Sequence, residues 1–169
     1  MPRADTSMSA QEQRAFLQTA RTAVLVSLGP DGMPDPVGMW FVLDGDDVWM
    51  RTYAASQKAV NLERDPRAAV LFEDGQRYAE LRGLQLSGRM ELTRDAERIA
   101  DVWTGLAMKY ERLPPEAVEG FRDAALARAA KQVAMRLVVE RVVSWDHAKL
   151  SEGETRVQRS GAEEIATKQ

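Results

Sequence analysis

The sequence predicts a mainly β domain in which an antiparallel meander of bending strands closes toward a barrel, with helices at its flanks. Asp-Gly pairs between apolar runs are the first observation behind this prediction: Asp31-Gly32, Asp44-Gly45 and Asp74-Gly75. Asp-Gly is the preferred pair for tight hairpin turns, because Gly tolerates a positive φ angle. In the long run after the third pair, Gly83 and Gly88 indicate bulges or sharp bends, which favour a barrel over a flat sheet.

Length and composition fit one ordinary domain with a sizeable core. The 169 residues are 44% hydrophobic and 29% charged. The formal net charge of -3 argues against a nucleic-acid partner, because phosphate backbones are held by an excess of Lys and Arg. The absence of Cys excludes disulfides, thiolate metal sites and a Cys nucleophile. We find no signal-peptide core and no apolar window of roughly 18 residues, so we expect a cytoplasmic protein without membrane contact.

The chain is predicted to begin with a helix followed by a strand. Ser9 and Glu12 have the spacing of a capping box, in which each side chain satisfies a free backbone N–H of the other residue. The helix should reach about Ala20 and bury Phe16 and Leu17. Residues 22–28, TAVLVSL, are rich in β-branched and aliphatic side chains and predict the first strand.

The remaining strands and helices follow from apolar runs and their boundaries. Further strands are predicted over residues 36–43, 47–52, 68–73, 77–92 and 132–145. A helix capped by Ser56 ends at Asp65, because the residue before Pro66 avoids the α region. An insertion at about 94–131 carries two helices, one over 94–110 and one opened by Pro114-Pro115. We therefore expect one domain over residues 1–150 and a mobile polar tail over 151–169.

A positively charged junction between a strand and a helix is the strongest candidate for a binding site. The strand ending at residue 52 leads through a short loop to the helix that follows Ser56. A helix N-terminus offers free backbone N–H groups and a partial positive charge, and Arg51, Thr52 and Lys58 add cations and a hydroxyl. These residues predict a site for a phosphate monoester or diester. A capped surface helix with solvated charges accounts for them equally well.

Flat and polarisable side chains on neighbouring strands suggest what lies beyond the phosphate. They occur at residues 39–41, MWF, and 48–50, VWM, where a planar ring could stack. Core or dimer contacts are the alternative, which we favour for Trp49 and leave open for Trp40. The single histidine, His147, has no clustered partner, so we interpret it as structural and expect no metal site.

These stretches resemble the pyridoxamine-phosphate-oxidase-like flavin-binding split barrels, and most closely their deazaflavin-binding branch, the flavin/deazaflavin oxidoreductases of the B group. The resemblance runs from about Thr22 to Leu150. It is carried by SQKAVNLERDPR at 56–67, the most specific stretch, together with LRG at 81–83 and SWDH at 144–147. It implies a six-stranded antiparallel split β-barrel of the FMN-binding type. It also implies a homodimer with two cofactor sites, each built from both subunits at the interface.

The resemblance further implies which residues bind the cofactor. Its phosphate is held by residues at the strand end and the helix start: Arg51, Thr52, Ser56, Gln57 and Lys58. The strand beside the ring system contains Met39, Trp40 and Phe41. Tyr78 and Trp145 are weaker candidates for contacts from the partner subunit. The helical insertion over 94–131 is longer than in the smallest members and could cover the mouth of the substrate site.

The implied activity is that of an oxidoreductase that binds coenzyme F420 and transfers a hydride from the reduced deazaflavin to an electron-poor C=C, C=N or nitro group of a small molecule. Tyr53, Tyr78 and Arg82 are all candidates for a hydrogen bond to the substrate, and the sequence assigns no catalytic residue. Two alternatives stay open. One is an FMN-dependent oxidoreductase of the same fold, because the phosphate argument is identical. The other is a non-catalytic cofactor carrier. A pyridoxamine-phosphate oxidase proper is disfavoured, because the chain is short and offers no second phosphate clamp.

Overall fold

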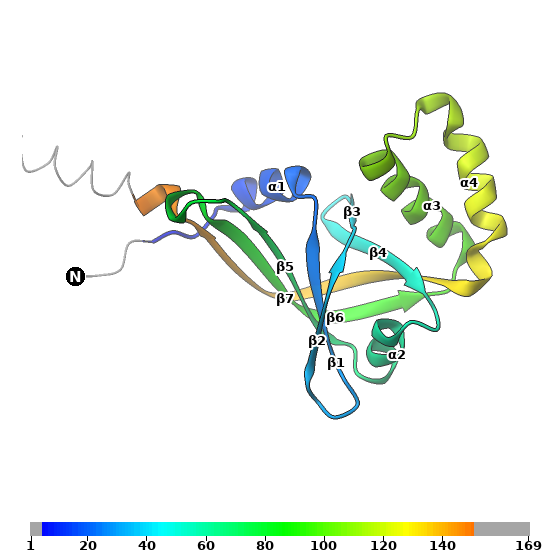
Figure 1. Cartoon of the computed structure of the whole chain (residues 1–169), viewed down its shortest axis with the longest axis horizontal. Coiled ribbons are helices and arrows are strands. Elements are labelled where there is room, and N and C mark those ends of the chain that lie inside the picture. Colours follow the sequence, from blue (N-terminus) through cyan, green and yellow to red (C-terminus); the bar gives the residue numbers. More distant parts are fainter. Residues whose placement is uncertain (1–4, 151–169) are drawn as a thin grey trace, which may run out of the picture.

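A curled antiparallel sheet with helices at its flanks forms the body of the protein in the computed structural model, which describes residues 5–150 (Figure 1). The strand order is β2-β1-β5-β6-β7-β4-β3. The strands are β1 (Ala23–Leu28), β2 (Pro34–Met39), β3 (Val42–Asp44), β4 (Asp47–Tyr53), β5 (Arg67–Asp74), β6 (Arg82–Thr93) and β7 (Gln132–Asp146). The predicted mainly β class is confirmed. The predicted tail lies outside the described residues.

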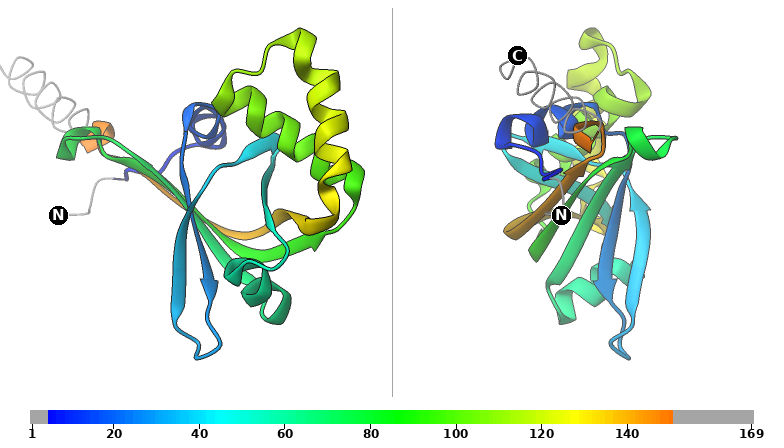
Figure 2. Two further views of the ribbon diagram at one scale, coloured as in Figure 1. Left: turned by 45° about the vertical axis from the view of Figure 1, so that its right-hand side comes forward. Right: turned by 90° about the vertical axis from the view of Figure 1, so that its left-hand side faces the viewer.

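The sheet has seven strands, so the expectation of six was wrong. The run 36–43 was predicted as one strand, but it divides at Trp40 and Phe41 into β2 and β3, which lie at opposite edges of the sheet. The backbone of Phe41 leaves the strand ladder because the Tyr110 hydroxyl bonds both its N–H and its carbonyl, each at 3.2 Å. Three Cα–Cα steps from Met39 to Val42 span at most about 11 Å. The two edges therefore approach one another, and the sheet curls into a split barrel (Figure 2).

Two apolar clusters hold the fold together, one on each face of β4. The larger fills the curl of the sheet, and its fully buried members include Leu25, Phe41, Phe72 and Met135. Phe41 and Phe72 meet edge to face with ring centroids 4.8 Å apart, a favoured geometry for aromatic pairs. The smaller cluster lies between the outer face of β4 and the helical insertion. Its members are Trp49, Ile99, Val102, Leu106, Ala129 and Ala134.

The helices begin and end largely where the sequence predicts. They are α1 (Ala10–Thr19), α2 (Gln57–Arg64), α3 (Ala96–Leu106) with a π turn, η2 (Ala107–Glu111), and α4 (Val118–Ala127). Short 3-10 turns occupy η1 (Tyr78–Glu80), η3 (Pro115–Ala117) and η4 (Ala129–Lys131). The capping box of α1 is confirmed, because the Glu12 N–H donates to Ser9 Oγ at 3.3 Å and the Ser9 N–H donates to Glu12 Oε2 at 2.6 Å.

All three predicted Asp-Gly turns lie between paired antiparallel strands, but the third opens a longer connection than a tight turn. Gly32 and Gly45 adopt positive φ angles of 81° and 61° between paired strands. After Gly75 the chain forms η1 before β6 begins at Arg82, so the long strand expected from residue 77 is shorter. The predicted irregularity at Gly88 is confirmed, since the register of β6 against β7 shifts there. None of the helices between residues 5 and 150 is long and apolar enough to cross a membrane.

Candidate functional site

The end of β4 and the start of α2 bring two hydroxyls and an amine together. The Oγ atoms of Thr52 and Ser56 lie 3.1 Å apart, and Lys58 Nζ lies 3.5 Å from Thr52 Oγ1. Thr52 is buried, while Ser56 and Lys58 are half-buried. Among residues 5–150, no carboxylate forms an ion pair with Lys58. The structure therefore assembles three of the five predicted phosphate residues into one cationic cluster, called the α2 cluster below.

The N-terminus of α2 is open toward this cluster. Ser56 occupies the N-cap position, but its side chain makes no capping hydrogen bond, so the predicted cap was wrong. The physical reason is that the hydroxyl pairs with Thr52 instead. The first N–H groups of a helix have no intrahelical acceptor, and an anion can satisfy them. Hydroxyls, an unpaired ammonium group and free N–H groups are together a donor set that fits a phosphate.

Arg51 lies on the opposite side of β4 from the α2 cluster. Successive strand residues point to opposite faces, so Arg51 faces the insertion while Thr52 faces α2. Its guanidinium stacks 3.8 Å from the centroid of the Trp103 ring, and Nη1 donates to Gln132 Oε1 at 2.7 Å. Burial lowers the pKa of Arg51 from its ordinary value. Its buried Nε has no hydrogen-bond partner in the described part of the chain. In a single chain, Arg51 is therefore held apart from the other four predicted phosphate residues.

A buried asparagine that sequence reasoning missed holds α2 in place. Asn61 is fully buried, and its Nδ2 donates to Ser27 Oγ at 3.2 Å and to Asp35 Oδ2 at 3.0 Å. Its Oδ1 accepts from Gln57 Nε2 at 2.9 Å. Gln57, predicted to touch phosphate, is thus engaged in positioning Asn61. The signal in the sequence was a polar residue between Ala59 and Leu62, on the face that α2 buries.

The three residues predicted to run beside a ring system have different surroundings. Trp40 is 50% exposed and stacks on Tyr110, with ring centroids 4.5 Å apart and planes 1° apart. The Phe41 side chain is fully buried in the core, so this chain exposes only one large aromatic face here. Met39 ends β2 and is partly buried. Trp49 belongs to the core cluster beneath α3, as we favoured.

Two cations that the sequence analysis did not single out, Lys109 and Arg21, lie over the rings of Phe41 and Tyr110. Lys109 Nζ lies 3.5 Å from the centroid of the Phe41 ring, and the Arg21 guanidinium lies 4.9 Å from that of Tyr110. Arg21 Nη1 also donates to the Lys109 carbonyl at 3.0 Å. Burial, together with the charge of Arg21, lowers the pKa of Lys109 to about 8. Burial raises the pKa of Tyr110.

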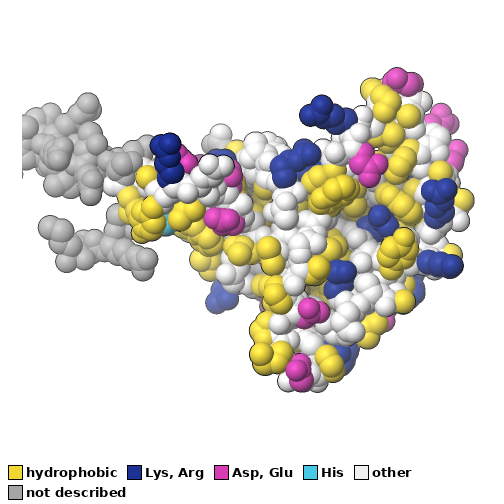
Figure 3. Space-filling model, in the orientation of Figure 1, with side chains coloured by type: hydrophobic (Ala, Val, Ile, Leu, Met, Phe, Trp, Pro, Cys, Tyr) yellow, Lys and Arg dark blue, Asp and Glu magenta, His cyan; other side chains and the backbone are white. Residues whose placement is uncertain are grey.

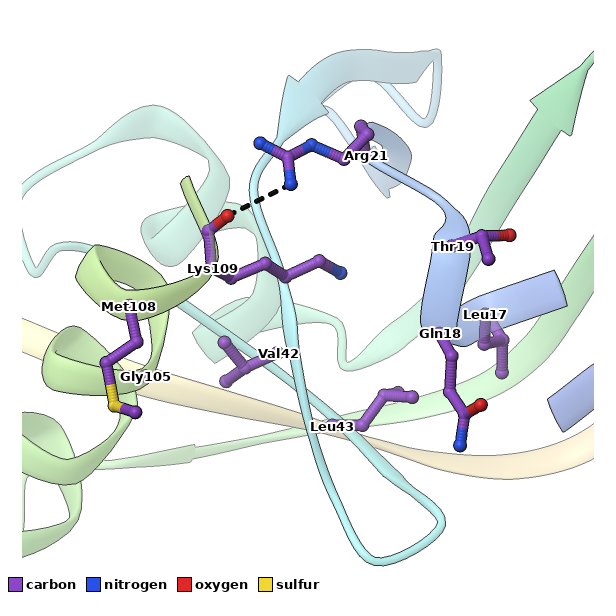
Figure 4. Close-up of a pocket in the computed structure, with 9 residues that line it drawn as sticks. All are labelled: Leu17, Gln18, Thr19, Arg21, Val42, Leu43, Gly105, Met108 and Lys109. Atoms are coloured by element: carbon purple, nitrogen blue, oxygen red, sulfur yellow. Dashed lines mark hydrogen bonds between the residues drawn. The ribbon is translucent and has the colours of Figure 1, made fainter. Parts of the chain in front are cut away.

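A cavity of about 710 Å³ opens beside Lys109, between α1, β3 and the end of α3 (Figure 4). The residues lining it are Leu17, Gln18, Thr19, Arg21, Val42, Leu43, Gly105, Met108 and Lys109. In Figure 4 the Lys109 side chain reaches across the cavity toward α1. A half-buried amine in a mostly apolar cavity can attract an anionic group of a ligand.

Tyr78 belongs to η1 and Trp145 to the last residues of β7, and both of these segments lie at the far end of the sheet from α2 (Figure 1). Tyr78 is 71% exposed, and its ring contacts that of His147 at 4.6 Å between centroids. His147 Nδ1 lies 2.9 Å from the Tyr78 carbonyl oxygen, which fits the structural role expected for this histidine. The Trp145 ring covers Gly83, where any Cβ would lie 2.1 Å from it. Within one chain these residues cannot join the α2 cluster.

Comparison with known proteins identifies the family. Residues 9–146 match the model of the family described as pyridoxamine 5'-phosphate oxidase. The chain belongs to this family. Membership confirms the predicted resemblance to pyridoxamine-phosphate-oxidase-like proteins and agrees with the curled sheet and flanking helices described above.

This chain is also similar to three individual proteins. An F420H(2)-dependent biliverdin reductase of Mycobacterium tuberculosis is 30% identical over 112 residues, which cover 65% of this chain and 78% of the relative. The crystal structure of Rv2991 from M. tuberculosis is 37% identical, with a TM-score of 0.80 and coverage of 89% of this chain and 92% of that one. A structure described as an F420 reductase is 22% identical, with a TM-score of 0.59 and coverage of 77% and 94%, and supports the fold alone.

Proposed function

We propose that this chain is an F420-dependent oxidoreductase of the pyridoxamine 5'-phosphate oxidase family, which passes a hydride to an electron-poor small molecule. The observation that carries the proposal is the α2 cluster, a donor set that fits an anion, in a chain that is 30% identical over 112 residues to an F420H(2)-dependent biliverdin reductase. When bound, the reduced deazaflavin supplies a two-electron hydride. The protein contributes binding, orientation and exclusion of water.

The α2 cluster would hold the cofactor's phosphate. Lys58 supplies a positive charge, while the Thr52 and Ser56 hydroxyls and the free N–H groups of α2 supply hydrogen bonds. Asn61 fixes this helix against β1 and β2, so the donors are ordered before a ligand arrives. The Met39–Phe41 segment would run beside the ring system, with the exposed face of Trp40 as its aromatic surface.

A homodimer is part of the proposal, because β7 carries an apolar surface that a single chain leaves open. Residues 138–143 are exposed, and β4 pairs only with residues 132–136 of β7, so this part of the strand has a neighbour on its β6 side alone. The exposed large side chains here are Val138, Val139, Val142 and Val143, each 38–44% accessible. Figure 3 shows further hydrophobic side chains along the arm of the sheet that extends away from α3 and α4. If a second copy covered this arm, its own Tyr78 and Trp145 would lie near the α2 cluster of the first copy. We place this dimer in the cytoplasm.

Calorimetric titration with oxidised F420, and separately with FMN, tests the cofactor assignment. We expect micromolar or tighter binding of F420 and much weaker binding of FMN. In Lys58→Met the affinity for F420 should fall at least about tenfold, equivalent to about 1.4 kcal/mol. The exposed Lys131 gives the matched control, and Lys131→Met should bind as the wild type does. Unchanged binding in a folded Lys58→Met variant would remove the phosphate site from the proposal.

Turnover separates an enzyme from a carrier of the same cofactor. Reduced F420, incubated with the wild-type protein and a panel of electron-poor alkenes, imines and nitro compounds, should be oxidised faster than in the protein-free control. Absorbance of the oxidised deazaflavin reports the rate. Tight binding without any acceleration across the panel would favour the non-catalytic alternative, and a preference for FMN would favour the flavin-dependent one.

A further inference from the structure

The cavity between α1, β3 and the end of α3 has the size and lining of a small-molecule site. Its volume of about 710 Å³ lies within the range of about 300–1,000 Å³ that is usual for ligand pockets. Leu17, Val42, Leu43 and the Met108 side chain give it apolar walls. An apolar ring or chain of a ligand could be buried against these walls.

Two cations border this cavity without a carboxylate to neutralise them. Neither Lys109 nor Arg21 forms an ion pair within residues 5–150, whereas Arg14, on α1, pairs with Asp46. The Lys109 amine is held instead over the faces of Phe41 and Tyr110, at 3.5 and 5.3 Å from their ring centroids. Aromatic faces attract a cation but do not cancel its charge.

Burial makes a charged Lys109 amine without an anionic partner unfavourable. The residue is half-buried, and burial favours the neutral amine. A ligand anion next to Nζ would restore the charged form and gain a charge-assisted hydrogen bond. Arg21 donates to the Lys109 carbonyl, so this hydrogen bond ties two cationic residues to the border of the same cavity (Figure 4).

We propose that this cavity binds a small organic anion with a flat apolar body, whose carboxylate or sulfonate meets Lys109 and Arg21. No residue lining it belongs to the α2 cluster, and α2 lies away from α1 and the end of α3 in both ribbon figures (Figures 1 and 2). The site is thus separate from the proposed phosphate site. It stands whether or not F420 is the cofactor.

Titration of the cofactor-free, full-length protein with 2-naphthoate tests the site by calorimetry. The neutral isostere 2-naphthamide has the same apolar body and lacks the charge. We expect 2-naphthoate to bind in the micromolar to low millimolar range, and 2-naphthamide to bind at least about tenfold more weakly, because a charged hydrogen bond is lost. Equal affinities for acid and amide, or no binding of the acid, would overturn the proposal.

Variants locate the anion. Lys109→Met and Arg21→Gln should each weaken 2-naphthoate at least about fivefold and leave 2-naphthamide unchanged, because only the charged contact is removed. Lys131→Met and Arg128→Gln, at exposed residues outside the cavity, are the matched controls and should behave as the wild type does. Wild-type affinity for 2-naphthoate in a folded Lys109→Met variant would overturn the assignment.

Chemical protection gives an answer that needs no variant. Saturating 2-naphthoate should slow acetylation of Lys109 by acetic anhydride several-fold relative to Lys131, as measured by peptide mass spectrometry. Equal acetylation of Lys109 with and without the ligand would contradict the site.

Repeating the 2-naphthoate titration with saturating F420 tests whether the cavity and the cofactor site are separate. Unchanged affinity supports separate sites, whereas competition would assign the cavity to the cofactor. Should F420 itself fail to bind, the proposed function fails while the cofactor-free titration still decides this site.

Discussion

Replacing Asn61 by Ala should strongly destabilise the fold. The Asn61 side chain is fully buried, donates to Ser27 and Asp35, and accepts from Gln57. Each lost hydrogen bond costs about 1 kcal/mol net, and a buried group left without a partner costs about 1–3 kcal/mol more. Ser27 is 1% exposed, so its hydroxyl becomes such a group. We expect the free energy of unfolding to fall by about 3–5 kcal/mol.

Urea unfolding followed by circular dichroism measures this change. Gln76→Ala is the matched control, because Gln76 is an exposed amide whose side chain forms no hydrogen bond within residues 5–150, and it should change the free energy of unfolding by less than about 0.5 kcal/mol. A loss below about 1 kcal/mol in Asn61→Ala would refute the reasoning, since water or a relaxed α2 would then replace the bonds. A loss of the expected size should also weaken F420 binding, because the same bonds hold the helix that presents Lys58.

Three further results are expected from other parts of the molecule. Gly88→Ala should unfold at a urea concentration well below that of the wild type, because its Cβ would lie 2.0 Å from a β7 carbonyl oxygen, whereas Gly120→Ala meets open space and should not destabilise the protein. Val142→Glu should convert the proposed dimer into monomers in light scattering, and Met33→Glu, at an exposed apolar side chain outside β7, should not. The affinity for 2-naphthoate should fall between pH 7 and pH 9.5, because Lys109 has a pKa of about 8 and loses its charge above it; a flat pH profile would contradict this.

The sequence was sufficient where structure depends on neighbouring residues. The capping box at Ser9 and the turn at Gly45 follow from side chains and backbone angles within a few positions, and both are confirmed. The strand–helix junction at Thr52 to Lys58 was found for the same reason, since its members lie within one short stretch. Successive side chains of a strand point to opposite faces, so Arg51 and Thr52 could have been separated from the sequence alone. We grouped them because Arg51 and Lys58 are both cations close to the start of α2.

The sequence was insufficient where residues far apart in the chain meet. Nothing near residue 40 indicates that the strand ends there, because the hydroxyl that interrupts it comes from Tyr110, 69 positions later. The cavity has the same origin, since Lys109 and Arg21 are 88 positions apart. The sequence left the role of the insertion open, with a cover over the mouth of the substrate site as one candidate. In the structure the insertion packs on the outer face of β4. Lys109 and Tyr110, which follow α3, contact Phe41 between β2 and β3.

Tyr110 joins the barrel to the cavity, and its two parts can be tested separately. The hydroxyl satisfies the Phe41 backbone, while the ring stacks on Trp40 and lies near the Lys109 amine. Tyr110→Phe keeps the ring and leaves the Phe41 N–H and carbonyl unpaired, so we expect about 1–3 kcal/mol less stability in urea unfolding with little change in 2-naphthoate affinity. Tyr110→Leu removes the ring as well and should weaken both. If Tyr110→Phe lost as much affinity for 2-naphthoate as Tyr110→Leu, the shape of the cavity would depend on the hydrogen bonds between the Tyr110 hydroxyl and the Phe41 backbone. The insertion would then shape the ligand site by fixing the backbone between β2 and β3.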